Sequence, residues 1–378
     1  MTTLKILHTA DIHLDSAFSG VDSRTAEVRR NELRASFTSM MTYAKMTAVD
    51  LMLIAGDLFD GDWVTRDTVR LLQREFETFG KPVFIAPGNH DPASPNSVWK
   101  RVTFPANVHV FTEPTVGAVD LTDEVGEDLG VTVYGYAFNA PDMETSPVAG
   151  LTVGDRRRIN LLCCHCDMTA PKSTDCPVTA AQLDRFGADY AALGHIHNPT
   201  APGHDNRWCY SGCLEPRAFD ELGPKGAIIV EIEKNSGKAS AVNLKKIRFS
   251  KRRYYKSELD LTGCETMRDA EDAVRAHIRG NGWGEDTLLS LRLTGFVSPA
   301  LVIDTEALED ADTGLYLLRV EDCTRPDVDL TALDKDPGVR GAVYRQLKPS
   351  LESDDPRTRE VGLCALRYAL SAISGDSV

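Results

Sequence analysis

Short apolar runs alternate with longer segments of mixed character along the first ninety residues. The runs occupy residues 4–7, 51–55 and 83–86, and runs of this length are typical of buried strands. Between them, apolar side chains recur at helical spacing over residues 22–47 and 65–79, and Thr65 is placed to cap the second helix. This order of strand and helix predicts parallel strands joined by helical crossovers.

The next part of the chain predicts a second layer of strands. Strand-like runs lie at residues 108–111, 131–136, 159–163, 190–193, 208–210 and 227–233. We expect the last two to pair around the loop between them, and we expect the acidic stretch 120–130 to be exposed. The predicted fold class is therefore α/β, a four-layer αββα sandwich in which helices cover two sheets.

The character of the chain changes beyond Asn235. A basic run interleaved with aromatic residues follows, containing Lys245, Lys246, Arg248, Phe249, Lys251, Arg252, Arg253, Tyr254, Tyr255 and Lys256. It either tracks a nucleic-acid backbone, with Tyr254 or Tyr255 stacking on a base, or forms an exposed interdomain strand. We place a boundary here and divide the chain into residues 1–250, a small α+β module at 251–335 and a helical tail at 336–378.

Composition narrows the class of protein. Of the 378 residues, 42% are hydrophobic and 26% are charged, and the net charge is −14. This net negative charge argues against a protein that coats nucleic acid by bulk electrostatic attraction. It does not exclude a nuclease, because a carboxylate-rich metal site itself carries negative charge. Since no apolar run approaches the length of a membrane span and no leader precedes the first strand, we expect a cytoplasmic protein with reduced thiols.

Side chains that bind metals follow the predicted strands at their carboxyl ends, where ligands sit in open α/β sheets. They are Asp11, His13, Asp57, Asn89, His165, His195 and His197. Oxygen and imidazole ligands together suit manganese, iron or zinc better than calcium. Seven ligands are too many for one tetrahedral ion, but they suit two ions roughly 3.5–4 Å apart that share a carboxylate. Such a pair favours phosphoester hydrolysis.

In their order along the chain, these motifs resemble those of the calcineurin-like metallophosphoesterases. They are Asp11-x-His13, Gly56-Asp57, Gly88-Asn89-His90-Asp91, His165 and Gly194-His195-x-His197. Within that superfamily, residues 8–14, 56–60 and 210–217 are similar to the SbcD-type DNA repair exonucleases, including the YhaO-like branch. The resemblance implies a nuclease domain at 1–250 and a DNA-facing capping domain at 251–335.

The resemblance also implies a part for each residue. One metal would be held by Asp11, His13, Asp57 and His197, and the other by Asp57, Asn89, His165 and His195. His90 would donate a proton to the leaving oxygen or stabilise charge, and Asp91 would orient His90. For Arg217, contact with a substrate phosphate competes with a structural salt bridge.

Three further features have simpler explanations. Cys163, Cys164 and Cys166 surround His165 and predict buried free thiols, with a separate structural zinc site as the alternative. His8 is expected to pack in the core. Asp15 either supports a metal ligand or has no part in the site.

We therefore expect a metal-dependent exonuclease or endonuclease that hydrolyses phosphodiester bonds at DNA ends in repair or recombination. Two Mn²⁺ ions are the expected cofactors, with iron or zinc as alternatives. The resemblance implies a homodimer and an SMC-like ABC ATPase partner. No Gly-x-x-x-x-Gly-Lys-Ser/Thr motif occurs in this chain, so any ATP dependence would come from that partner. The alternative functions are a phosphodiesterase for nucleotides or other small phosphoesters, and a non-catalytic DNA-binding or structural subunit.

Overall fold

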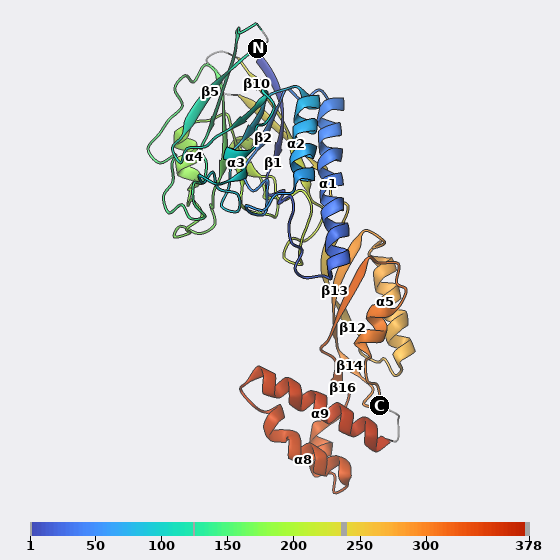
Figure 1. Ribbon diagram of the computed structural model, residues 1–378. Coiled ribbons are helices and arrows are strands. Elements are labelled where there is room, and N and C mark those ends of the chain that lie inside the picture. The colour runs from blue at the N-terminus through green and yellow to red at the C-terminus, as the bar shows by residue number, and fades with distance from the viewer. Residues whose placement is uncertain (1, 124, 236–239, 375–378) are drawn as a thin grey trace. The chain divides into compact units, whose positions relative to one another are not determined.

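The computed structural model describes residues 2–123, 125–235 and 240–374, and the chain forms two compact units, Met1–Lys251 and Arg252–Val378 (Figure 1). The further division expected between residues 335 and 336 stays a prediction, and residues 375–378 of the expected tail lie outside the described residues. Among the described residues, no helix is both long enough and apolar enough to cross a membrane.

The first sheet of the N-terminal unit has six strands in the spatial order β11-β10-β1-β2-β3-β4. Their bounds are Thr2–Thr9 (β1), Leu51–Ile54 (β2), Val83–Ile85 (β3), Val108–Val110 (β4), Gly226–Lys234 (β10) and Ala241–Arg248 (β11). Neighbours from β1 to β4 are parallel, whereas β10 is antiparallel to β1 and to β11.

The second sheet has five strands in the order β5-β6-β7-β8-β9. Their bounds are Gly117–Thr122 (β5), Asp128–Gly135 (β6), Ile159–His165 (β7), Tyr190–Gly194 (β8) and Trp208–Tyr210 (β9). Strands β6 to β9 are parallel, and β5 is antiparallel to β6. Because β1 and β2 each contact β8, the two sheets lie against each other.

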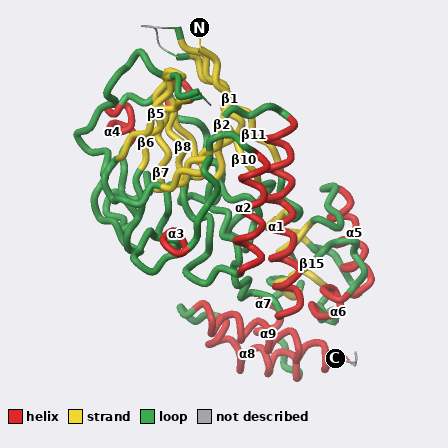
Figure 2. The backbone as a smooth tube through the Cα atoms, turned by 45° about the horizontal axis from the view of Figure 1, so that its top comes forward, coloured by secondary structure: helices red, strands yellow, loops and turns green. Residues whose placement is uncertain are grey.

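The crossover helices of the first sheet begin where their capping residues predict. The helices of this unit are α1 (Ser23–Met46), α2 (Arg66–Phe79), α3 (Val98–Arg101), α4 (Ala180–Phe186) and a 3₁₀ turn at His204–Asn206. The Asp22 carboxylate accepts hydrogen bonds from the first backbone N–H groups of α1, and the Thr65 hydroxyl accepts one at the start of α2. Figure 1 and Figure 2 show α1 and α2 side by side.

Three apolar cores separate four layers. Phe37 of α1 and Phe76 of α2 pack on one face of the first sheet. Leu53 and Leu161 lie in the core between the two sheets, and Phe186 of α4 packs on the outer face of the second sheet. The predicted αββα sandwich is confirmed.

One expectation about the strands is wrong. Residues 208–210 do not pair with residues 227–233, because β9 joins β8 in the second sheet and β10 joins β1 in the first. The apolar pattern of a strand identifies a buried strand but not its partner. The acidic stretch 120–130 is largely exposed, as expected, although parts of it belong to β5 and β6 and Leu121 is buried.

The C-terminal unit is built on a parallel sheet in the order β12-β13-β15. Its elements are β12 (Arg253–Asp260), α5 (Met267–Gly280), β13 (Thr287–Thr294), β14 (Phe296–Val297), α6 (Thr305–Asp310), β15 (Leu317–Asp322), β16 (Arg325–Pro326), α7 (Leu330–Lys335), α8 (Val339–Leu351) and α9 (Pro356–Ser374). Leu366 and Leu370 of α9 pack with Tyr344 of α8 in a small core within the predicted helical tail.

The two tyrosines of the basic run pack inside this unit. Tyr254 is buried, and the Tyr255 ring stacks on Trp283 with 5.4 Å between the ring centroids. The Arg253 guanidinium pairs with Asp286 at 2.7 Å. The interpretation that either tyrosine stacks on a nucleic-acid base is therefore not supported, because both rings already have protein neighbours.

Candidate metal centre

The predicted ligands converge because they follow strands whose carboxyl ends meet. Asp11 and His13 come after β1, Asp57 after β2, Asn89 after β3, and His195 after β8, while His165 is the last residue of β7. Backbone hydrogen bonds fix the first two loops against each other, including those from His13 N–H to the Asp57 carbonyl at 2.9 Å and from Asp11 N–H to the Gly56 carbonyl at 3.0 Å. Another joins Leu14 N–H to the Leu58 carbonyl at 2.9 Å. The carboxyl ends of the strands therefore position the predicted ligands.

The backbone at these ligands is strained. Asp11, His13, Asp57 and His195 have φ angles of 51°, 50°, 51° and 104°, in the left-handed region that non-glycine residues rarely adopt. Such strain is tolerated where the surrounding structure holds it, commonly at functional sites. Close packing adds a further constraint, because a Cβ atom at Gly88 would lie 2.2 Å from Asp57 Oδ1.

Four of the predicted ligands form one tight cluster. Ligand atoms of Asp11, His13, Asp57 and His197 all lie within 4.8 Å of one another. The His13 Nε2 atom lies 3.7 Å from Asp57 Oδ2, and His197 Nε2 lies 3.9 Å from Asp11 Oδ1. This cluster is the set that the resemblance assigns to one metal.

The remaining predicted ligands, Asn89, His165 and His195, lie beside the cluster. The His165 Nε2 atom is 2.8 Å from Asn89 Oδ1 and 3.5 Å from Asp57 Oδ2. The ring of His195 stands edge-on to that of His165, with 5.3 Å between their centroids, and its Nε2 atom faces Asp175 at 4.0 Å. His165 and Asn89 are thus close together, whereas His195 is further from them.

The donor atoms fit a bound cation. His13 Nδ1 lies 2.9 Å from Asp60 Oδ1, and His197 Nδ1 lies 2.6 Å from Glu221 Oε1. An ionised carboxylate only accepts, so both Nδ1 atoms donate, and a neutral ring then has its Nε2 lone pair free. The two Nε2 atoms face each other at 3.1 Å, where two lone pairs repel unless a proton or a metal ion lies between them.

The buried ionisable groups at the cluster also indicate a bound cation. One carboxylate oxygen of Asp11, Oδ2, is buried and has no hydrogen-bond partner among the described residues, and burial raises the pKa of this carboxyl to about 7. Burial lowers the pKa of His13 and of His165 to about 4, so both rings are neutral as metal ligation requires. Burial works against ionisation of Asp57, but the neighbouring His90, whose backbone N–H donates to Oδ1, helps to hold the pKa of Asp57 below the ordinary value.

His90 lies at the open side of the cluster. Its side chain is 44% exposed, its ring stands 4.8 Å from the His13 ring, and its backbone N–H donates to Asp57 Oδ1 at 3.0 Å. Its nearest carboxylate among the described residues is Asp60, 3.6 Å from Nδ1. A partly exposed imidazole next to the ligands is well placed to meet a substrate.

Asp91 does not orient His90, contrary to expectation. Its carboxylate accepts hydrogen bonds from the backbone N–H groups of Gly88 at 2.7 Å and Phe59 at 3.1 Å. Burial and the nearby Asp57 raise the pKa of Asp91 well above its ordinary value. Asp91 therefore braces the two loops that carry Asp57 and Asn89, and Asp60 takes the place beside His90.

Sequence patterns missed two carboxylates that orient the ligands. Asp60 contacts His13, and Glu221 contacts His197, at the distances given above. Arg217 bridges both, with Nη1 2.8 Å from Asp60 Oδ1 and Nη2 3.4 Å from Glu221 Oε1. Arg217 thus makes the salt bridges that the structural alternative for this residue predicts. Asp60 closes the motif Gly56–Asp60, but no local pattern identifies Glu221.

His8 and Asp15, the other polar residues near the site, contact residues outside the metal cluster. The buried His8 ring contacts the Tyr190 hydroxyl at 2.8 Å, and burial lowers its pKa to about 3. The Asp15 carboxylate accepts from Arg34 and from the backbone N–H of Thr65, so it joins α1 to the start of α2.

The cysteine cluster does not look like a zinc site. Cys163, Cys164 and Cys166 are buried free thiols. The groups of described residues that could hold a metal contain no cysteine, which favours free thiols over a zinc site.

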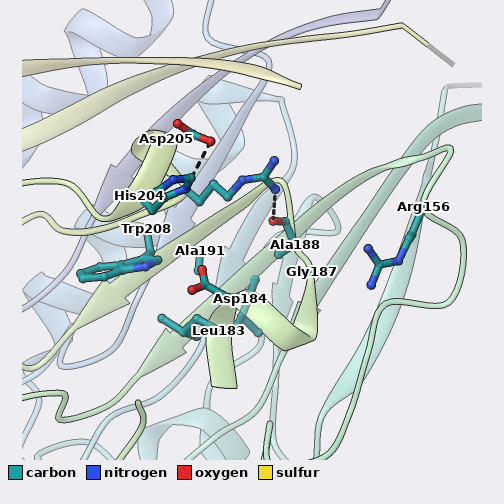
Figure 3. A pocket seen from close by; sticks show the side chains of 11 residues that line it. Arg156, Leu183, Asp184, Gly187, Ala188, Ala191, His204, Asp205 and Trp208 are labelled. Atoms are coloured by element: carbon teal, nitrogen blue, oxygen red, sulfur yellow. Dashed lines mark hydrogen bonds and ion pairs between the residues drawn. The ribbon is translucent and has the colours of Figure 1, made fainter. Parts of the chain in front are cut away.

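A pocket of about 360 Å³ lies elsewhere in the N-terminal unit (Figure 3). Arg156, Asp184 and Trp208 contribute to its lining, and no predicted ligand does. His204 pairs there with Asp205 at 3.2 Å, and Arg207 donates to the Ala188 carbonyl at 3.4 Å. The pocket is separate from the metal cluster.

Residues 4–199 match the family model described as calcineurin-like phosphoesterase. All the predicted ligands, together with His90 and Asp91, fall inside the matched segment, whereas Arg217 and Glu221 lie beyond it.

Curated relatives extend the comparison. "Uncharacterized metallophosphoesterase YhaO" of Bacillus subtilis (strain 168) is 28% identical over 241 residues, covering 61% of this chain and 58% of the relative. "DNA double-strand break repair protein Mre11" of Aeropyrum pernix is 27% identical over 283 residues, covering 68% and 64%. A subunit of the nuclease SbcCD from Staphylococcus epidermidis is 24% identical over 263 residues, covering 61% and 67%. The chain therefore spans less than two thirds of the length of the first two relatives.

Proposed function

Because this chain belongs to the calcineurin-like phosphoesterase family, we propose that it is a two-metal DNA nuclease acting at DNA ends. Family membership and the cluster of Asp11, His13, Asp57 and His197 make the protein a metal-dependent phosphoesterase. The observation that carries the proposal is the facing pair of Nε2 atoms in His13 and His197, 3.1 Å apart beside two buried carboxylates.

The proposed ligands divide between two divalent ions, with Mn²⁺ as the proposed metal. The first ion would be held by Asp11, His13, Asp57 and His197, and the second by Asp57, Asn89, His165 and His195. When bound, the two ions supply positive charge that offsets the phosphate oxygens and lowers the pKa of water. The 2.8 Å and 3.5 Å distances from His165 to Asn89 and Asp57 support the second group.

The residues of the chain then perform two tasks. Asp60 and Glu221 hold the His13 and His197 rings so that each Nε2 points into the cluster. Hydrolysis joins a water oxygen to phosphorus and breaks the P–O bond to the leaving group, whose oxygen takes up a proton. His90, partly exposed beside the cluster, supplies that proton.

DNA as substrate is the finer part of the proposal. The names of two relatives describe a nuclease component and a double-strand break repair protein, which supports a DNA substrate and action in repair. Because one of these relatives is named as part of a multi-chain nuclease, its name also supports a complex. We extend the proposal to a cytoplasmic homodimer that works with an SMC-like ABC ATPase.

Cleavage assays with Mn²⁺ test the proposal. The substrates are linear single- and double-stranded DNA, bis-p-nitrophenyl phosphate and cyclic nucleotides. His90→Ala should lower the turnover of DNA by roughly 10²–10⁴-fold, because a general acid contributes that much, and should leave Mn²⁺ binding intact. Asp57→Ala should abolish metal binding and activity together. His204→Ala, which changes an exposed histidine outside the cluster, is the control.

Two results would contradict the assignment. Full turnover of DNA by His90→Ala would remove this residue as the proton donor. Cleavage confined to the small esters and cyclic nucleotides would refute the DNA nuclease and leave a phosphodiesterase for small substrates.

A further inference from the structure

The loop after Asp60 displays a tryptophan close to the metal cluster. The Trp63 side chain is 94% exposed, whereas Trp99 is buried and Trp208 and Trp283 are partly buried. Single exposed apolar residues are common on proteins, so exposure alone does not indicate a binding site. The position of Trp63 distinguishes it, because the loop begins at the carboxylate that contacts His13 and His90.

Protein contacts hold this loop at both ends and in the middle. The Asp60 N–H donates to the Leu14 carbonyl at 3.2 Å, and the Thr65 N–H donates to Asp15 Oδ2 at 2.8 Å. Arg101 donates to the Asp62 carbonyl at 3.2 Å, and the half-buried Val64 packs against the core. The backbone on each side of Trp63 is therefore fixed while its ring projects into solvent.

The ring is within reach of a substrate strand at the cluster. Trp63 follows Asp60 by three residues, so its Cα atom lies at most about 11 Å from that of Asp60. Neighbouring nucleotides on one strand are about 3.4 Å apart along a duplex axis, so this reach corresponds to roughly three base steps. A base within three nucleotides of the scissile phosphate can thus meet the indole.

The flanking residues favour a base over an apolar protein partner. Asp62 and Arg66 are exposed and charged, so the tryptophan does not sit in an apolar stretch of the loop. Stacking on a base requires only the flat face of the ring and is tolerant of sequence. A tryptophan also has only two side-chain torsions to fix, so ordering it costs little entropy.

We propose that Trp63 stacks on a nucleobase of the substrate within three nucleotides of the scissile phosphate and so sets the preference for nucleic acid over small phosphoesters. The inference rests on the proposed nuclease function. It assigns Trp63 to substrate binding and leaves bond cleavage to the metal cluster and His90.

Substitution of Trp63 tests the proposal on the full-length chain with Mn²⁺. Base stacking contributes about 1–3 kcal/mol, so Trp63→Ala should raise KM for a single-stranded thymidine oligonucleotide by about 5- to 150-fold with kcat little changed. Trp63→Phe should restore part of the loss. Met46→Ala is the control, because Met46 is 81% exposed at the end of α1 that leads into the amino end of β2, away from the cluster.

Abasic oligonucleotides test the contact from the side of the substrate. Abasic sites are placed singly at the three nucleotides next to the cleaved bond. One position should raise KM for the wild type as much as Trp63→Ala does on the intact strand, and the two changes together should cost no more than either alone. Independent costs that add up would overturn the stacking contact.

Fluorescence supplies a readout without catalysis. In EDTA, the oligonucleotide should quench the tryptophan emission of the wild type, and Trp63→Ala should lose most of that quenching. An unchanged KM and unchanged quenching in the variant would overturn the inference even if the wild type cuts DNA. A wild type that cuts no DNA would instead refute the proposed function. Loss of self-association or of ATPase binding, with KM unchanged, would assign Trp63 to a protein interface and overturn the proposal.

Discussion

Glu221 offers the sharpest test of how the metal cluster is held. The variant Glu221→Gln preserves the shape of the side chain but removes its charge. The carboxylate is almost fully buried and accepts hydrogen bonds from His197 Nδ1 at 2.6 Å and from the Arg217 backbone N–H at 2.5 Å. An amide has one oxygen for these two donors, so one of the hydrogen bonds must be lost.

The size of the effect follows from the bond that is lost. Burial opposes ionisation of Glu221, but His197 and Arg217 lower its pKa to about 2, so the carboxylate is charged at neutral pH. A hydrogen bond to a charged group contributes about 1.5–3 kcal/mol. If His197 loses this orientation, Mn²⁺ affinity should fall roughly 10- to 100-fold, the range expected for residues that support metal ligands.

Isothermal titration of Mn²⁺ into metal-stripped protein measures this affinity directly. Thermal denaturation checks that the variant is folded. Glu27→Gln, which makes the same change at an exposed position on α1, is the matched control and should bind Mn²⁺ like the wild type. A Glu221→Gln affinity within twofold of the wild type, in a folded protein, would refute the idea that this carboxylate positions His197.

Two further predictions concern stability. Lys234→Met leaves the Asp189 carboxylate buried without the ammonium that now contacts both its oxygens at 2.7 and 2.9 Å, so we expect the free energy of unfolding in urea to fall by about 3–5 kcal/mol; a loss below about 1 kcal/mol would contradict this. His8 has a folded pKa of about 3, below its unfolded value of about 6.5, so the unfolded state alone gains a proton as the pH falls between these values. From pH 7 to pH 5, urea titrations should show that the wild type loses about 2 kcal/mol more stability than His8→Gln, and parallel losses would argue against a buried neutral ring.

Local sequence signals predicted the two crossover helices of the first sheet well. The ends of α1 and α2 follow from Asp22, Thr65 and the apolar spacing, which act within a few residues. The partners of β9 and β10 could not be predicted in the same way. Strand pairing depends on which apolar face meets which neighbour, and a run such as 227–233 fits either sheet.

In the candidate site, too, features encoded in the local sequence were predicted, whereas contacts between residues distant in the sequence were not. Each predicted ligand follows an apolar strand, so its position is encoded in its own neighbourhood. Glu221 meets His197 across 24 residues, and Asp60 meets His13 across 47 residues. These contacts exist only after the loops between the strands have folded, and single carboxylates in loops carry no distinguishing pattern. The expectation for Asp91 was wrong for the same reason, because backbone N–H groups of folded loops decide where its carboxylate lies.

Arg217 contacts both carboxylates that support the metal ligands, and these contacts limit its ability to bind a substrate. Its guanidinium pairs with both Asp60 and Glu221, the carboxylates that hold His13 and His197. If the guanidinium moved to a substrate phosphate, at least one of these carboxylates would lose a positive neighbour, and the imidazole that it holds would be less firmly oriented. Substrate contact by Arg217 would therefore weaken the cluster needed for hydrolysis. The geometry favours Arg217 as a residue that positions both imidazoles together.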